Sequence, residues 1–340
     1  MKDNPHGGNG NVRLDFSASV NPLGTPEGAK VAARAAIDSS HLYPDPCCRE
    51  LISAIGEHEG VPEDYILCGT GAAELIYAYA AALRPKTALE AAPTFSEYAE
   101  ALEINGLTMD RFFLRREKDF SPDGGFLRKI EKDTPEAVFI CNPNNPTGRL
   151  WDRGLVAEIF DICKSKNIRL FVDECFLELV GGESMKDRLA EYSGLFILRA
   201  FTKTWGMAGL RLGYCLTSDK ELLTKMSRLC PPWNISVPAQ AAGVAALKDG
   251  VFLQKARELI IKERPILKAG LEALGLYVCP SEANYLLFYA PEDLGEKLLK
   301  KGIALRDCRN FPGLSPGWYR AAVRNAGDNA ELLSAVREAL

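Results

Sequence analysis

The chain has 340 residues, which is enough for more than one ordinary domain and for a large buried core. Its 45 acidic and 41 basic residues give a net charge of −4, without the basic surplus that nucleic-acid-binding proteins carry. Residues 1–5 contain no apolar signal segment, and no run reaches the roughly 18 apolar residues needed to cross a bilayer. We therefore expect a cytoplasmic protein with neither a nucleic-acid nor a membrane partner.

Apolar runs of strand character alternate with helical stretches such as 152–166 through the first two thirds of the chain. This alternation predicts an α/β fold with a mostly parallel, helix-covered sheet. After Pro231 the pattern changes to long helices, notably 249–274, followed by four short strands at 276–279, 284–288, 303–306 and 319–323. We expect an N-terminal arm over 1–30 that joins the small domain, a large domain over 31–230 and a small C-terminal domain over 231–340. The runs assigned to the sheet are 66–68, 87–91, 137–141, 168–172, 195–199 and 212–216.

The first motif is a strand that passes through a glycine turn into an alanine-rich helix at residues 67–76. Free N–H groups and the positive end of the helix dipole attract an anion there, and the glycines allow its close approach. The segment lacks the Gly-x-Gly-x-x-Gly pattern and the Walker lysine, so it favours a single phosphate over a dinucleotide or a nucleoside triphosphate.

Two further motifs follow strands of the predicted sheet. Residues 142–148, Asn-Pro-Asn-Asn-Pro-Thr-Gly, form a turn in which a proline is a candidate for a cis peptide bond. Asp173 ends the apolar run 168–172. A strand-end acid can cap a helix, bind a metal or hold a proton on a pyridinium nitrogen, and its surroundings alone leave these roles open.

The fourth motif, residues 199–213, places Lys203 in an apolar, glycine-bearing stretch and Arg211 eight residues later. A lysine kept from water has a lowered proton affinity and can form a Schiff base with an aldehyde, while the arginine can hold a phosphate. A solvated loop lysine is the alternative for this motif alone. Its position about thirty residues after Asp173 favours the Schiff-base interpretation.

Together and in this order, the four motifs resemble the fold-type I pyridoxal-phosphate enzymes of the aspartate aminotransferase superfamily, over nearly the whole chain. The resemblance implies pyridoxal 5'-phosphate as the cofactor. Lys203 would bind it covalently, Asp173 would pair with its ring nitrogen and Asn145 would donate to its ring oxygen. The remaining implied cofactor contacts are Phe95 on the ring, Ala72, Ala73, Thr202 and Arg211 on the phosphate, and Tyr43, which would reach the phosphate of a neighbouring subunit in a homodimer.

Two positions depart from the family pattern. Ala200 stands three residues before the lysine, where the family usually has a serine or threonine on the phosphate. Phe176 stands three residues after Asp173, where aminotransferases usually carry a tyrosine. The chain therefore lacks one hydroxyl near the phosphate and one phenol near the ring oxygen.

The two ends of the chain indicate a branch of the superfamily. Residues 6–9 and 14–24 at the N-terminus and residues 306–311 and 319–324 at the C-terminus look like threonine-phosphate decarboxylase of the cobamide pathway, a relative of histidinol-phosphate aminotransferase. A substrate with a carboxylate and a phosphate needs at least two fixed cations. The resemblance assigns the carboxylate to Arg320 and the phosphate to Arg306, with Arg324, His6 and Asn21 as further substrate contacts.

Alternatives remain at this stage. The same fold can host an aminotransferase acting on histidinol phosphate or on another amino acid, or a cofactor-binding module that regulates a partner. Arg309 and Arg324 can equally be solvated surface charges. The ten cysteines, without a Cys-x-x-Cys, are interpreted as reduced packed thiols, and with only three histidines, all before residue 60, no metal site is predicted.

Overall fold

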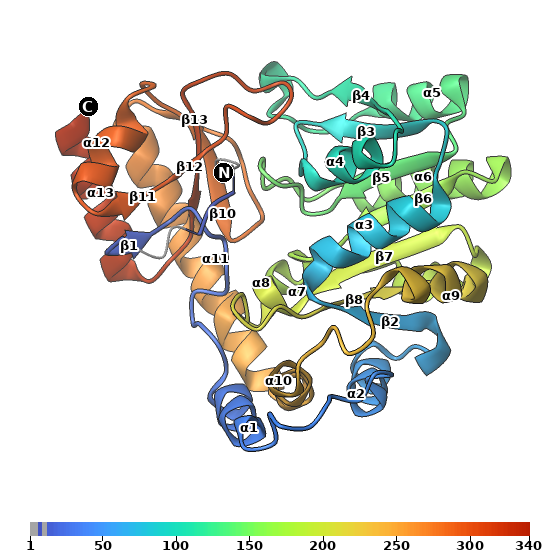
Figure 1. Ribbon diagram of the computed structural model, residues 1–340. Helices are drawn as coiled ribbons and strands as arrows, with labels where there is room; N and C mark the ends of the chain where they lie inside the picture. The colour runs from blue at the N-terminus through green and yellow to red at the C-terminus, as the bar shows by residue number, and fades with distance from the viewer. Residues whose placement is uncertain (1–5, 9–11) are drawn as a thin grey trace.

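The computed structural model describes residues 6–8 and 12–340 (Figure 1). Its central sheet has seven strands in the order β2-β8-β7-β6-β5-β3-β4, and all are parallel except β8, which runs antiparallel to both of its neighbours. The strands are β2 (Ile66–Gly69), β3 (Ala88–Ala92), β4 (Met109–Phe113), β5 (Ala137–Cys141), β6 (Arg169–Asp173), β7 (Leu195–Ala200) and β8 (Gly213–Leu216).

Helices cover the sheet because each crossover between parallel strands needs one. Several begin at an aspartate whose carboxylate accepts a hydrogen bond from the first turn, as Asp152 does from Leu155 N and Asp219 from Leu222 N. The helices of this part are α2 (Arg49–Glu59), α3 (Gly71–Leu83), α4 (Glu97–Ile104), α5 (Gly124–Asp133), α6 (Arg153–Lys166), α7 (Leu177–Val180), α8 (Phe201–Thr204) and α9 (Lys220–Leu229), with 3₁₀ turns at Glu63–Tyr65, Arg116–Lys118 and Met185–Glu191.

The C-terminal elements form a second layer beside this sheet (Figure 1). A four-stranded sheet, in the order β12-β13-β10-β9, packs against helices α11 and α13 and has an apolar cluster of its own. The strands of this sheet are β9 (Tyr277–Val278), β10 (Tyr285–Tyr289), β12 (Arg306–Asp307) and β13 (Trp318–Ala322), and the helices of this part are α11 (Gly250–Ala273), α12 (Leu294–Lys300) and α13 (Ala326–Ala339). Helices α1 (Glu27–Ile37) and α10 (Val237–Leu247) pack against each other at the base.

The six predicted strands of the large sheet and the long helix are confirmed within two residues at each end. The structure adds β4, which the sequence pattern did not reveal. The predicted strand 303–306 is two strands: β11 (Ile303–Ala304) pairs in parallel with β1 (Leu14–Asp15), whereas β12 pairs with β13. The chain passes from one sheet to the other at Leu305 because the N-terminal segment supplies a partner for β11.

The domain boundaries proposed at residues 30 and 230 stay predictions, and residues 1–5 and 9–11 of the predicted arm lie outside the described residues. Across the part of the chain that the structure describes, no helix combines the length and the apolar character needed to cross a membrane.

Glu90 is a buried acid in the middle of β3, opposite Arg111 of β4. Arg111 Nε donates to Glu90 Oε1 at 2.8 Å, but Oε2 is buried without a partner among the described atoms. Burial raises the pKa of Glu90 to about 7, although the charge of Arg111 opposes the shift. The folded state therefore holds the proton more tightly than the unfolded state does.

This raised pKa predicts a pH-dependent loss of stability. Because the unfolded chain releases the proton near pH 4.5, the free energy of unfolding should fall by up to about 3 kcal/mol as the pH rises from 4.5 to 7. In urea unfolding, Glu90→Gln should not show this fall in the free energy of unfolding between pH 4.5 and 7. Glu117→Gln, at an exposed position, should still show it. Parallel pH profiles for Glu90→Gln and the unsubstituted protein would show that Glu90 does not titrate in this range.

Candidate active site

Most of the predicted site residues meet at one edge of the large sheet. The strands β2, β5, β6 and β7 run in the same direction, so their carboxyl ends share an edge, and β8 begins there because it is antiparallel. Register pairs place Gly213 opposite both Gly69 and Ala200, and Asp173 opposite Cys141. The four motifs, distant in sequence, are therefore brought together by strand order.

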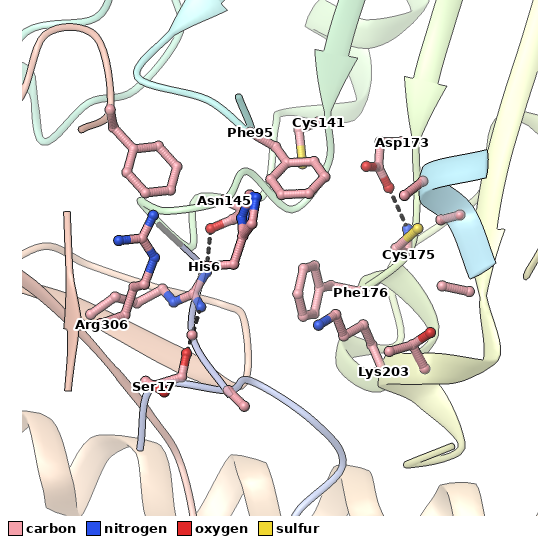
Figure 2. A pocket seen from close by; sticks show the side chains of 18 of the residues that line it. His6, Ser17, Phe95, Cys141, Asn145, Asp173, Cys175, Phe176, Lys203 and Arg306 are labelled. Carbon is pink, nitrogen blue, oxygen red and sulfur yellow. Dashed lines mark hydrogen bonds between the residues drawn. The ribbon is translucent and has the colours of Figure 1, made fainter. Parts of the chain in front are cut away.

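A cavity of about 200 Å³ lies at this edge, between the large sheet and the C-terminal elements (Figure 2). Eleven predicted site residues line it, together with the substituted positions Phe176 and Ala200. Among the described residues that line this cavity, Asp173 is the one acid. The predicted residues in its wall are His6, Ala72, Ala73, Phe95, Asn145, Asp173, Thr202, Lys203, Arg211, Arg306 and Arg320.

Lys203 lies in the single turn of α8, with its ammonium group facing the cavity (Figure 2). Burial lowers its pKa from 10.5 to about 8, and the positive charge of Arg320 adds to the effect. Two backbone contacts support the turn: Asn21 N donates to Lys203 O at 3.0 Å and Asn21 Nδ2 to Thr204 O at 2.8 Å. At neutral pH a much larger fraction of this amine than of an ordinary lysine is therefore unprotonated and nucleophilic.

Asp173 is held at the end of β6 by two donors. Tyr98 Oη donates to its Oδ2 at 2.5 Å, and Cys175 N donates to its Oδ1 at 2.9 Å. The carboxylate is buried. Tyr98 was not identified from the sequence because it lies 75 residues away on α4, where its spacing is that of an ordinary core residue.

Asn145 follows β5 in a turn whose X–Pro bonds at Pro143 and Pro146 are cis, as is the bond before Pro93. The neighbouring Asn144 fixes this turn, because its Nδ2 donates to Pro93 O and to Thr147 Oγ1 at 2.9 Å each. Asn145 Oδ1 accepts a hydrogen bond from Arg320 Nη1. Because this oxygen is already bonded, the Nδ2 of Asn145 is the end of the amide left to donate, and its donation to the cofactor stays a prediction.

The N-terminus of α3 forms a cradle for an anion. No side chain caps the first turn, so its N–H groups at Ala72 and Ala73 remain available. Gly71 has φ +79°, and a Cβ there would lie 2.7 Å from Arg211 Nη2, so only glycine allows this arginine to approach the turn. Thr202 lies in the same wall, and Ala200 offers no hydroxyl.

Arg306 and Arg320 are directly opposite each other in the antiparallel pair of β12 and β13. Both are buried, and no described carboxylate lies within ion-pair distance of either guanidinium group. Arg320 Nη2 donates to Ser17 O at 2.9 Å, and its Nε is buried without a described partner. Burial lowers the pKa of Arg306, and Arg320 contributes further. Two facing cations in one wall favour the binding of an anion.

His6 and Phe95 lie together in the cavity wall. The His6 ring contacts Phe95 edge-on, with centroids 6.3 Å apart, and its Nε2 is 3.1 Å from Glu97 Oε1. Tyr77 Oη also donates to Glu97, at 2.9 Å. Glu97 therefore ties the N-terminal segment to α4.

Three predicted residues do not line the cavity. Asn21 supports the lysine turn instead, since both ends of its amide are bonded to backbone groups. Arg324 lies beyond β13, which ends at Ala322; its Nε donates to Asp328 Oδ2 at 2.7 Å, and its guanidinium group packs over Phe16. Tyr43 is 80% exposed and stacks on Trp233.

A buried ion network lies behind the strand ends. Arg199 of β7 pairs with Glu174, the residue after Asp173, at 3.0 Å and lies 3.7 Å from Glu59 of α2. This network joins the end of β6, which carries Asp173, to β7, which leads into the turn that carries Lys203. The sequence analysis did not reveal this network, because nothing near a charged residue in a strand indicates which distant residue it pairs with.

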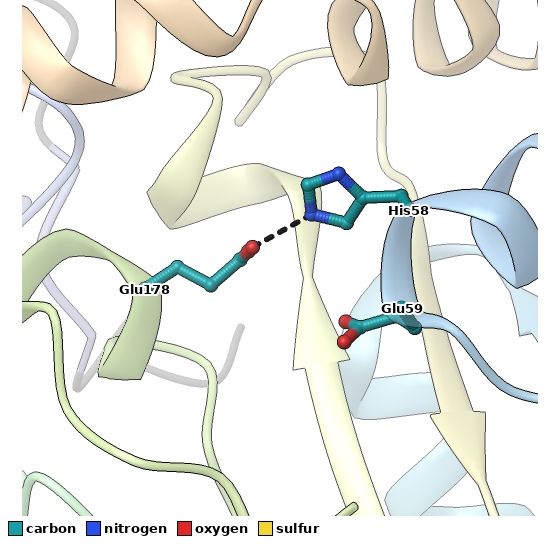
Figure 3. Close-up of side chains that lie close together, drawn as sticks. All are labelled: His58, Glu59 and Glu178. Atoms are coloured by element: carbon teal, nitrogen blue, oxygen red, sulfur yellow. Dashed lines mark hydrogen bonds and ion pairs between the residues drawn. The ribbon is translucent and has the colours of Figure 1, made fainter.

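His58, Glu59 and Glu178 come close together at the edge of this network (Figure 3). His58 Nε2 lies 2.8 Å from Glu178 Oε1, and this hydrogen bond raises the pKa of His58. Glu59 Oε1 and Oε2 already accept from Tyr214 and Lys186, respectively. The three side chains therefore complete an ion network, and their ligand atoms are already bonded to protein groups.

The fold and the site define a pyridoxal-phosphate enzyme of fold type I. An amine of lowered pKa and a fixed carboxylate line the same cavity, while the uncapped helix and the Gly71–Arg211 contact fit a phosphorylated, anionic group. When bound, pyridoxal 5'-phosphate supplies an electron sink for bonds at the α-carbon of an amino acid. Lys203, Asp173, Asn145 and the α3 turn are the residues that would hold it.

The chain belongs to the aminotransferase class I and II family, whose profile matches residues 12–338. It is 37% identical to threonine-phosphate decarboxylase of Salmonella typhimurium, over 96% of this chain and 91% of that protein. It is 34% identical to histidinol-phosphate aminotransferase of Anaeromyxobacter sp., over 94% and 89%. The crystal structure of histidinol-phosphate aminotransferase from Clostridium acetobutylicum superposes with a TM-score of 0.88, at 30% identity, over 96% of this chain and 98% of that one.

The lowered pKa of Lys203 predicts how the apoprotein takes up its cofactor. The rate of covalent attachment of pyridoxal 5'-phosphate should rise with pH and level off above about pH 8, because only the unprotonated amine attacks the aldehyde. Stopped-flow absorbance would follow the reaction, with Lys203→Ala as the unreactive control. Covalent attachment in Lys203→Ala, or a rate still rising at pH 10, would contradict the assignment.

Proposed function

We propose that this enzyme decarboxylates L-threonine O-3-phosphate to (R)-1-amino-2-propanol O-2-phosphate, a step of cobalamin biosynthesis. The observation that carries the proposal is the buried pair of facing guanidinium groups, Arg306 and Arg320, without carboxylate partners among the described residues. Such a pair is costly to bury without a counterion and is stabilised by a ligand with two anionic groups. The relative named threonine-phosphate decarboxylase supports the same substrate.

The two buried arginines suit the two anionic groups of this substrate. Arg320 lies beside Asn145 and contributes to the lowered pKa of Lys203, so it is the cation nearer the reacting end of the cavity and suits the α-carboxylate. Arg306 is held by Asn310 Oδ1 at 2.8 Å and stacks on Phe311 in the same wall, where it suits the phosphate. His6 would close over the phosphate from the N-terminal segment.

Lys203 is the group placed to move protons at the α-carbon. Because its pKa is about 8, it can return a proton to that carbon after the carboxylate has left. Phe176 lies beside it, with the Lys203 Nζ 5.9 Å from the ring centroid. A phenyl ring there offers no second proton donor, in keeping with a reaction that needs one proton at one atom.

The alternative is an aminotransferase acting on histidinol phosphate or another amino acid, which the histidinol-phosphate aminotransferase relatives support. Histidinol phosphate has no carboxylate, so it would leave Arg320 without its anion until the second substrate binds. An aminotransferase would consume 2-oxoglutarate, and a decarboxylase would not.

The purified enzyme should release carbon dioxide from threonine phosphate without consuming 2-oxoglutarate. In Arg306→Ala, kcat/KM for threonine phosphate should fall by about 30-fold to 1,000-fold, roughly 2 to 4 kcal/mol, because a desolvated dianion loses one guanidinium partner. Arg309→Ala is the matched control, since Arg309 is exposed and pairs with Asp307, and its rate should change less than about threefold.

The decarboxylase assignment fails if the unsubstituted enzyme shows no preference for phosphorylated over free threonine. It also fails if the enzyme converts threonine phosphate by transamination without releasing carbon dioxide. Histidinol phosphate with 2-oxoglutarate should be included in the same assay, because turnover there would support the aminotransferase instead.

We further propose that the enzyme works as a cytoplasmic homodimer. Tyr43 and Trp233 stack with their ring centroids 4.7 Å apart, and both are exposed, at 80% and 46%, next to the exposed Leu42. An apolar surface of this kind is covered when two copies meet, and Tyr43 would then reach the partner's cofactor phosphate. Sedimentation at assay concentration should give a dimer with full activity; a fully active monomer would exclude this arrangement.

A further inference from the structure

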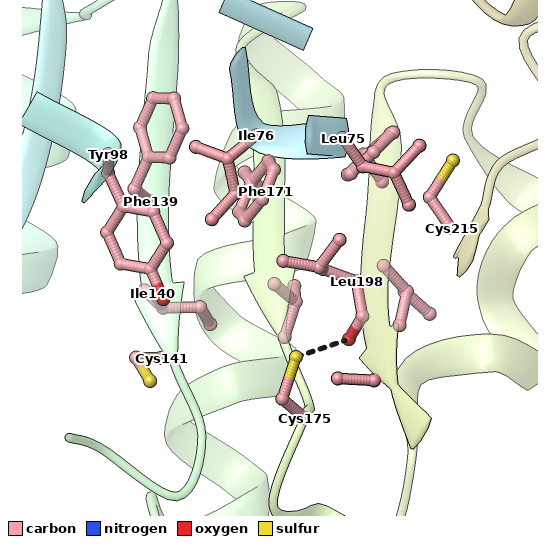
Figure 4. Packing of buried hydrophobic residues seen from close by; sticks show 14 of the residues in the cluster. Leu75, Ile76, Tyr98, Phe139, Ile140, Cys141, Phe171, Cys175, Leu198 and Cys215 are labelled. Carbon is pink, nitrogen blue, oxygen red and sulfur yellow. Dashed lines mark hydrogen bonds between the residues drawn. The ribbon is translucent and has the colours of Figure 1, made fainter. Parts of the chain in front are cut away.

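Tyr98 is an unassigned residue that contacts the carboxylate at the centre of the site. It is buried on α4 and lies among three aromatic rings, with centroid distances of 5.8 Å to Phe139, 5.6 Å to Phe171 and 5.7 Å to Phe95. Figure 4 shows its ring beside Phe139, with the hydroxyl group directed toward the end of the strand that carries Cys141. Such close packing leaves the phenol one orientation.

The Tyr98 hydroxyl group donates a hydrogen bond to Asp173. Its hydrogen bond to Oδ2, at 2.5 Å, and that of Cys175 N to Oδ1, at 2.9 Å, leave each carboxylate oxygen with one fixed donor. Burial raises the pKa of Tyr98 well above its ordinary value, and the negative charge of Asp173 raises it further. The phenol therefore stays protonated throughout the range in which enzymes work and can donate this hydrogen bond to Asp173.

Donors to a buried carboxylate stabilise its ionised form and fix the plane of the group. Without Tyr98, the Oδ2 atom would be buried without this partner, and the carboxylate could rotate away from its orientation.

We propose that Tyr98 is a positioning residue that holds the carboxylate of Asp173 in the orientation in which it pairs with the ring nitrogen of pyridoxal 5'-phosphate, and so helps to keep that nitrogen protonated. The inference rests on the proposed role of Asp173 as partner of that nitrogen. It extends the site to α4, whose first residue, Glu97, also contacts His6 at the cavity wall. One short helix thus fixes both the deep carboxylate and the N-terminal segment.

The chain offers a matched control for this proposal. Tyr79 is buried in the same aromatic cluster, with centroids 5.0 Å from Phe171 and 5.9 Å from Phe139, but its hydroxyl group has no partner among the described atoms. Tyr79→Phe and Tyr98→Phe each remove one hydroxyl group from the same core. Only the second removes a donor to Asp173.

The test loads both variants and the unsubstituted protein with ¹⁵N-labelled pyridoxal 5'-phosphate and records the ¹⁵N chemical shift of the ring nitrogen between pH 6 and 9. In Tyr98→Phe the shift should move toward the unprotonated value, and cofactor affinity should fall by about tenfold, the effect of one hydrogen bond to a charged group. Tyr79→Phe should match the unsubstituted protein in both. Thermal unfolding checks that each variant is folded.

An unchanged ¹⁵N shift and affinity in folded Tyr98→Phe would overturn the proposal. Failure to fold would be resolved with Tyr98→His, which keeps a donor in the ring and should retain the protonated signal; loss of that signal there would count against a hydrogen-bonding role. Asp173→Asn separates the two assignments. If the ring nitrogen stays protonated in Asp173→Asn, Asp173 is not the partner of that nitrogen. If Asp173→Asn loses the protonated ¹⁵N signal but Tyr98→Phe keeps it, only the proposed role of Tyr98 is overturned.

Discussion

The site depends on cations that face one another with too few acids to balance them. Arg306 and Arg320 occupy opposite positions in adjacent strands, and Lys203 and Arg211 line the same cavity, where Asp173 is the one acid among the described lining residues. Repulsion from Arg320 adds to the burial that lowers the pKa of Lys203. Burial, with this charge surplus added to it, makes the lysine nucleophilic, and the surplus makes the cavity a receptor for anions.

The fold holds these charges in place by tying distant segments together. Strand order brings the carboxyl ends of four parallel strands to one edge, and the N-terminal segment crosses from β11 to the lysine turn. There a Cβ on Gly206 would lie 2.1 Å from Gly24 O, so the close approach of the two segments requires glycine. The ion pair of Arg199 with Glu174 fixes the strand ends from behind. The cavity is therefore shaped by contacts between segments more than by any single motif.

This organisation explains which parts of the site could be predicted from the sequence. Lys203, Asp173, Asn145 and the α3 turn lie within motifs whose residue types carry their chemistry, and the structure brings them into one cavity. Asn21 and Arg324 have equally suitable residue types but lie elsewhere, because Asn21 bonds to the lysine turn and Arg324 to Asp328 at the start of α13.

Tyr98 and Arg199 are residues of the site region that could not be identified from the sequence. Each acts through a partner on another element, 75 residues away for Tyr98 and Asp173, and a tertiary contact of this kind leaves no periodic signal. The division of 303–306 into two strands has the same origin, since the partner of β11 lies at the other end of the chain.

Ligand binding to Lys203→Ala loaded with pyridoxal 5'-phosphate tests the central claim most directly, because the cavity keeps both facing arginines while turnover is prevented. Calorimetry should compare threonine phosphate with free threonine, which lacks the phosphate, and with 1-amino-2-propanol O-2-phosphate, which lacks the carboxylate. If Arg306 and Arg320 each bind one anion, threonine phosphate should bind at least about 30-fold more tightly than either analogue. Equal affinity for all three ligands would contradict the account.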